Sequence, residues 1–147
     1  MAFKPSKLGY EAQAKTGFTH QVVIDHNDFT ATGNTQSFTL SVPAGMAVGK
    51  AFHRLVSDFD SSDATLTSLT YIVGDGGSTN RFLTSTQVCV DGTEVDYKAG
   101  ALSDYYVYTV ADTIDIAFTA TTGKDISTLN TGKLVLFLQM FDSKELA

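Results

Sequence analysis

Alternation between apolar and polar residues with a period of two recurs along this chain and is cleanest at residues 35–42. There Phe38, Leu40 and Val42 share one face, and small hydroxyl residues occupy the other. This period is that of a β-strand buried on one side. Residues 43–45, with one proline and one glycine, supply turn chemistry where the alternation stops. The segment therefore predicts a strand that ends in a turn.

Similar short segments follow one another with turn signals between them. Together with residues 35–42 they predict about nine strands, the other segments being 21–26, 50–59, 66–73, 87–90, 94–97, 105–110, 114–120 and 134–141. Asp91 and Gly92 form a dipeptide that favours a type I′ turn, so residues 87–97 predict a β-hairpin. Single helical turns are expected only at residues 80–85 and 125–130. This pattern predicts an all-β fold, a single antiparallel β-sandwich that is jelly-roll-like.

The composition supports the same fold class. The chain has 147 residues, which suits one domain, and only 18% of them are charged. Its 20 threonines and 12 glycines favour strands and turns, whereas the residues that usually cover helix surfaces are scarce. We expect residues 1–20 to form an extended N-terminal arm and residues 21–147 to form the sandwich domain.

The charge distribution separates the arm from the rest of the chain. Residues 1–20 carry Lys4, Lys7 and Lys15 against Glu11, a net charge of +2, so the remaining residues carry −8. The arm shows neither the strand nor the helix period. A basic segment before an acidic body is typical of an interaction tail, and a disordered terminus is the alternative.

The closing segment, residues 134–141, is apolar on both faces. Leucines and a methionine alternate on one face, while Val135, Phe137 and Phe141 occupy the other. In a two-sheet sandwich only one face of a strand points inward, so the second face must be covered by a loop, by the arm or by another subunit. The sequence leaves these three covers open.

Charge and segment composition exclude several partners. A net charge of −6, with only two arginines, disfavours direct nucleic-acid binding and contact with an anionic membrane. No apolar run approaches the ~20 residues of a membrane-spanning helix. The first twenty residues lack the apolar core of a signal peptide, and the single cysteine fits synthesis in a reducing host cytoplasm.

No residue set pairs a nucleophile with a base, so we expect a non-enzymatic protein without cofactor or metal. Residues 74–80 are glycine-rich but lack the lysine-containing ending of a phosphate-binding loop, which favours a flexible hairpin loop. The spacing of His20, His26 and His53 matches no metal site, and Cys89 lies between valines, which favours packing. Three aspartates lie close together in the sequence, which favours a solvated turn, with a weak ion site as the alternative: Asp58, Asp60 and Asp63.

Tyrosines gather at residues 105–108. Tyr106 and Tyr108 share a face with Val110, which favours the core, whereas Tyr105 points the other way. An outward tyrosine can stack on a sugar ring or anchor a protein partner. A carbohydrate- or receptor-binding module that uses Tyr105 and residues 75–80 is therefore the alternative function.

Three segments, residues 87–95, 108–114 and 132–142, carry a hairpin pattern that resembles small structural proteins of tailed-bacteriophage virions. The resemblance implies a β-sandwich or jelly-roll domain that decorates, cements or joins the capsid or tail and has no active site. It also implies location in the virion and partners that are copies of the chain and other capsid or tail proteins. We expect the partner interface to include Phe3, Lys4, Lys7, Leu8, Tyr10, Tyr105, Val135, Phe137 and Phe141.

Overall fold

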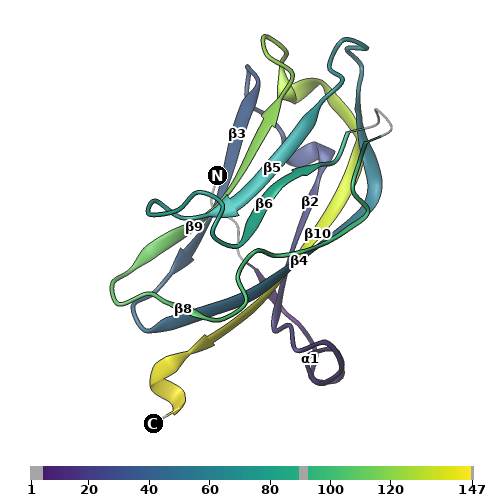
Figure 1. The fold of residues 1–147 in the computed structure, drawn as a ribbon. Coiled ribbons are helices and arrows are strands. Elements are labelled where there is room, and N and C mark those ends of the chain that lie inside the picture. Colours follow the sequence, from purple (N-terminus) through teal and green to yellow (C-terminus); the bar gives the residue numbers. More distant parts are fainter. Residues whose placement is uncertain (1–4, 90–92, 147) are drawn as a thin grey trace.

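The structure is a computed structural model that describes residues 5–89 and 93–146. Two antiparallel sheets pack face to face, as the sequence predicted (Figure 1). Within these residues, helical structure is confined to one α-helix and three short 3-10 helices: α1 (Tyr10–Thr16), η1 (His26–Asp28), η2 (Ile126–Thr128) and η3 (Ser143–Leu146).

The larger sheet has six strands and contains the two longest strands, which lie next to each other. Its order is β1 (Ser6–Lys7), β2 (His20–Asp25), β10 (Leu129–Asp142), β4 (Met46–Ser61) and β7 (Tyr97–Ala99), and β8 (Tyr106–Val107) also pairs with β4. The smaller sheet has four strands in the order β3 (Thr35–Val42), β9 (Asp112–Ala120), β5 (Leu69–Gly74) and β6 (Leu83–Gln87).

The strand order is that of a jelly roll. Without the two-residue strands β1 and β8, the larger sheet reads β2, β10, β4, β7 and the smaller reads β3, β9, β5, β6. Successive strands therefore cross between the sheets, except at the β5–β6 hairpin. This is the double Greek-key arrangement of eight strands in two sheets, so the expected fold class is confirmed.

The core between the sheets is rich in aromatic rings. Phe29 lies edge-on to Phe38, Phe59 and Phe118, with ring centroids 4.9–5.8 Å away, and Tyr71 stacks on Phe118 at 4.9 Å. All five rings are buried. Edge-to-face and offset-stacked geometry adds to the apolar burial of such rings. The inward residues of the alternating segments thus form one continuous core.

The β10 strand bends where it passes the core, and a glycine makes the bend possible. Gly132 has a φ of +121°, and its ladder with β4 shifts register on both sides of it. A Cβ atom at this position would lie 2.3 Å from the ring of Phe59. Both the backbone conformation and the close contact therefore require glycine here.

The described part of the arm contains two elements that the sequence did not predict. Strand β1 pairs with the start of β2, Ser6 opposite Gln21, and helix α1 follows it. The helix ends at Gly17, whose φ of +75° and N–H bond to the Gln13 carbonyl form a left-handed C-cap. With seven residues, α1 is too short for a helical period to show in the sequence.

Two local expectations were wrong, and one was confirmed. Residues 80–85 do not form a helical turn, because Leu83 begins β6 and is fully buried against the core. Residues 87–97 do not form a regular hairpin ladder in the described part, because Gln87 ends β6 in one sheet and Tyr97 begins β7 in the other; one backbone bond joins the two arms, from the Val95 N–H to the Gln87 carbonyl at 2.8 Å. The Asp91-Gly92 dipeptide lies outside the described residues. The expected turn at residues 125–130 is confirmed by η2.

Candidate interaction surface

The outer face of the six-stranded sheet carries six aromatic side chains, which we call the aromatic face. They come from three strands and two loops. Along β10 and β4 the inward positions supply the core, and the alternate positions point outward. The ladder places Phe137 of β10 opposite Phe52 of β4. The aromatic face comprises Phe18, Phe52, Tyr97, Tyr105, Phe137 and Phe141.

Phe18 forms the centre of this face. It follows α1, and its ring centroid lies 6.2 Å from that of Phe52 and 6.1 Å from that of Phe137. Phe52 also contacts Tyr97 of β7, at 6.4 Å. These four rings are partly accessible to water, and Tyr97 remains 64% exposed. Phe18 of the arm therefore covers part of the outer face of the six-stranded sheet, and the rest of that face stays accessible to water.

A second pair of rings lies further along the same face. Tyr105 packs edge-on against Phe141 with centroids 5.0 Å apart. It lies directly over Gly49 of β4, where a Cβ atom would come within 2.8 Å of the Tyr105 ring. Tyr105 is 45% exposed, as is its neighbour Val107. Because Gly49 has no side chain, the Tyr105 ring can pack directly on the sheet at this position.

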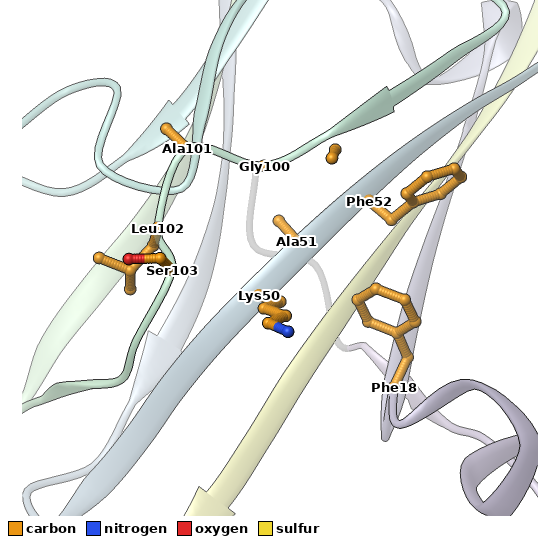
Figure 2. Close-up of a pocket in the computed structure, with 9 residues that line it drawn as sticks. Phe18, Lys50, Ala51, Phe52, Gly100, Ala101, Leu102 and Ser103 are labelled. Carbon is orange, nitrogen blue, oxygen red and sulfur yellow. The ribbon is translucent and has the colours of Figure 1, made fainter.

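Two shallow hollows adjoin Phe18 and Phe52. The first, about 300 Å³, lies between β4 and residues 99–103, as Figure 2 shows. The second, about 280 Å³, lies between Thr16, Arg54 and Phe137. Of the described residues that line them, the only charged ones are Lys50 in the first hollow and Arg54 in the second. The hollows are therefore apolar with a positive charge at each.

The structure brings four of the predicted interface residues onto one surface. Tyr105, Phe137 and Phe141 belong to the aromatic face, and Val135 lies beside it, buried to 9% exposure between Val23 and Arg54 in the ladder. That a partner covers the accessible part of this surface remains a prediction.

The predicted arm residues lie at the edge of the same sheet. Lys7 is in β1, and the half-buried Leu8 donates its N–H to the Thr19 carbonyl, 2.8 Å away. Tyr10 begins α1 and is 86% exposed. Phe3 and Lys4 lie outside the described residues.

Sequence reasoning missed Phe18, Phe52 and Tyr97. Phe52 had a signal, because it alternates with the buried residues Ala51 and His53 in a predicted strand. Phe18 lies in an arm without a period, so nothing in the sequence indicated that it returns to the sheet.

The glycine-rich loop between β5 and β6 is organised around one buried carboxylate. Asp75 accepts hydrogen bonds from Arg81 at 2.7 and 3.2 Å and from the Tyr108 hydroxyl at 2.8 Å. It also accepts from the backbone N–H groups of Gly77 and Ser78. Burial alone would raise the pKa of Asp75, but the bonds from Arg81, Tyr108 and Ser78 lower it to about 2.

The bonds to Asp75 link the two sheets and also take its carboxylate out of any external binding surface. Tyr108 follows β8 of the larger sheet, so its bond to Asp75 links the two sheets, and Arg81 also lies 3.7 Å above the ring of Tyr106. The loop is thus a hairpin loop, as expected, but one held by specific bonds. Because the carboxylate of Asp75 is used internally, the Asp75 part of the expected carbohydrate-binding surface is wrong.

The remaining candidate residues have structural roles. His53 is fully buried, with one ring nitrogen 2.7 Å from the Val95 carbonyl and the other against the Tyr71 hydroxyl. Burial lowers the pKa of His53. The thiol of Cys89 is buried, as predicted.

The turn expected at residues 58–63 begins later than predicted, because Asp58 and Asp60 belong to β4, which continues to Ser61. Asp63 accepts from Thr65 and lies 3.6 Å from Lys124, and Asp60 accepts from the N–H of Ser61. Among residues 5–89 and 93–146, no three His, Cys, Asp or Glu side chains converge in a metal-binding geometry. No helix in the same ranges is long and apolar enough to span a membrane.

Comparisons with known proteins show a shared fold. No protein-family model matches the sequence, and no curated protein matches it. Among solved structures, a chain of the cyanophage Pam1 capsid asymmetric unit is similar over 82% of this chain and 79% of that chain, with 21% identity and a TM-score of 0.54. A chain of the acid-stable capsid of Helicobacter pylori bacteriophage KHP30 is similar over 82% of this chain and 90% of that chain, with 17% identity and a TM-score of 0.44. The chain thus shares its jelly-roll fold with a chain of a cyanophage capsid.

Proposed function

We propose that this protein is a non-enzymatic structural component of a bacteriophage virion, acting as a decoration or cement protein of the capsid or a related head or tail component. The observation that carries the proposal is the shared fold with a chain of the Pam1 capsid asymmetric unit, over about four-fifths of both chains. Fold alone does not determine function, so the surface must supply a means of assembly.

The aromatic face supplies that means. A large exposed apolar patch on one side of a small domain is a feature of protein interfaces, and aromatic residues are enriched at such contacts. Here the patch lies on one sheet, with the arm beside it. Many copies bound to a symmetric shell would add weak individual contacts into a tight assembly.

The direct test is the composition of the particle. Virions of the phage that encodes this chain, purified by density gradient, should contain the protein in many copies by quantitative mass spectrometry. Its recovery only from the soluble fraction of the lysate would contradict the proposal.

A second test addresses the arm. Deletion of residues 1–16 removes β1 and α1 but retains Phe18, so the sandwich should still fold and give a cooperative melt. If the arm contributes contacts, the truncated protein should be lost from particles that retain the full-length protein. Incorporation of both proteins to the same level would assign the contacts to the sheet alone.

A further inference from the structure

Helix α1 has an unusual surface for so short an element. None of its seven residues is buried, and it begins with Tyr10, which is 86% exposed, and Glu11, which is also exposed. An isolated helix of this length is unstable in water. Local bonds hold this one, from the Gln13 side chain to the Leu8 carbonyl and from the Thr16 hydroxyl to the Ala12 carbonyl. The helix thus presents an exposed aromatic ring and an exposed carboxylate in its first turn.

The hollows on the aromatic face have the complementary character. The first is an apolar site of about 300 Å³ beside Phe18 and Phe52, with Lys50 at its edge (Figure 2). This volume is at the lower end of the ~300–1,000 Å³ range of ligand pockets, which suits one inserted side chain. Arg54 marks the second hollow, next to it.

The charged groups of α1 and of the two hollows form no ion pair in the described part of the chain. Among the described residues, the ion pairs are those of Arg81 with Asp75 and of Lys124 with Asp63, so Lys50, Arg54 and Glu11 have no partner of opposite charge. Tyr10 makes no hydrogen bond within the described part of the chain and is too exposed to occupy the chain's own hollow.

We propose that α1 of a second copy of this chain docks on the aromatic face. Tyr10 enters the hollow beside Phe18 and Phe52, and Glu11 lies against Lys50 and Arg54. This deepens the proposed function, because it names the contact through which copies would associate. Direct packing of two aromatic faces is disfavoured, since it would bring the cations of the two copies together, whereas the α1 contact pairs opposite charges.

The test is self-association of the full-length protein, measured by sedimentation equilibrium at low salt. The wild-type protein should associate, and raising the ionic strength should weaken the association by screening the charges. Tyr10→Ser, Glu11→Lys and Arg54→Glu should each raise the dissociation constant at least tenfold. The matched controls Val110→Ser and Asp60→Lys change an exposed apolar residue and an exposed acid elsewhere, so they should leave it unchanged.

A charge exchange makes the test specific. An equimolar mixture of Glu11→Lys and Arg54→Glu proteins should associate more tightly than either variant alone, because Glu11 of one chain then meets Arg54 of the other. A wild-type protein that is monomeric at millimolar concentration, or a mixture that is no tighter than its components, would overturn the proposal. The particle composition is measured separately, so a monomeric protein that is still found in virions would contradict this contact and leave the virion role intact.

Discussion

The two sheets of this protein have matching inner faces and opposite outer faces. On the four-stranded sheet the outward side chains of two strands are small and mostly hydroxylated: Thr35, Ser37, Thr39 and Ser41 of β3, and Thr113, Asp115, Ala117 and Thr119 of β9. On the six-stranded sheet the outward positions of the central strands carry Phe52, Phe137 and Phe141, joined by Phe18 from the arm.

This difference separates the needs of folding from those of binding. The core requires apolar residues only on the inner faces, and the four-stranded sheet shows that a polar outer face is compatible with the fold. The aromatic rings on the other outer face are not needed to fill the core, which is why we propose that face as an interaction surface. Substitutions at seven positions test this comparison and the contacts that hold the sheets together, in order of decreasing expected effect on stability.

The largest effect is expected in β10, where a carboxylate introduced on the inner face is compared with one introduced on the outer face. Leu136 is fully buried, and Phe137 next to it points outward and is half-buried. Leu136→Asp should unfold the domain, because an unpaired buried charge costs about 3–5 kcal/mol. Phe137→Asp should retain a cooperative thermal transition by circular dichroism, since water reaches the new carboxylate. Equal unfolding by both variants would mean that the outer face is as essential to the fold as the core.

The link between the sheets should come next. Asp75→Asn removes the charge that holds Arg81 and Tyr108, and should lower the free energy of unfolding by about 2 kcal/mol in urea titrations at pH 7. The matched control is Asp63→Asn, whose partner Lys124 is 3.6 Å away and water-exposed. This control should cost clearly less, because water screens an exposed ion pair. A loss no greater than that of the control would show that the buried pair contributes nothing.

The same carboxylate gives a pH dependence of known sign. Its pKa in the folded protein is about 2, below the ~3.9 of an unfolded aspartate, so its stabilisation is present above about pH 4 and is lost as the pH falls through 2. The wild-type protein should therefore lose more stability between pH 4 and pH 2 than Asp75→Asn does. Parallel acid titrations of the two proteins would contradict this assignment.

A smaller effect is expected at His53. Burial lowers its pKa in the folded protein, so unfolding allows it to take up a proton below about pH 6.5. Its contribution is complete above that pH and declines as the pH falls. The melting temperature of the wild-type protein should drop more between pH 7 and pH 5 than that of His53→Gln. Differences that are constant from pH 8 to pH 5 would exclude this role.

The smallest effect on stability tests the outer faces directly. Ser37→Phe places an aromatic ring on the polar face, and should change the free energy of unfolding by no more than ~0.5 kcal/mol. Phe52→Ser removes a ring from the aromatic face and should cost about 1 kcal/mol, since the ring is half-buried. Only Phe52→Ser should weaken self-association in sedimentation. If Ser37→Phe created an equal association, any exposed ring would suffice.

Much of the fold could be predicted from local periodicity. Residues 35–42 form β3 with the predicted bounds. The burial of Cys89 and the helical turn within residues 125–130 were also predicted. The prediction failed at residues 80–97, where the chain passes from one sheet to the other. A turn dipeptide indicates where the chain reverses direction locally, but not which sheet each flanking segment joins.

The candidate site was predicted only in part, for a related reason. The apolar outer residues of β10 showed that a second face needed covering, but not that Phe18 would cover a part of it. That contact joins residues 119 positions apart in the sequence and depends on the β1–β2 pairing and the C-cap at Gly17. None of these features has a period that a sequence pattern can show.

The sequence by itself determined that this is an all-β domain with alternating strands, an acidic body, and one strand that is apolar on both sides. These properties follow from residue type and spacing, because the side chains of a strand alternate between its two faces. Tertiary structure alone decided the jelly-roll strand order, the Asp75 link between the sheets, and the gathering of six rings and two cations on one outer face. These depend on contacts between distant segments, which form because each inner face must be buried against the other sheet.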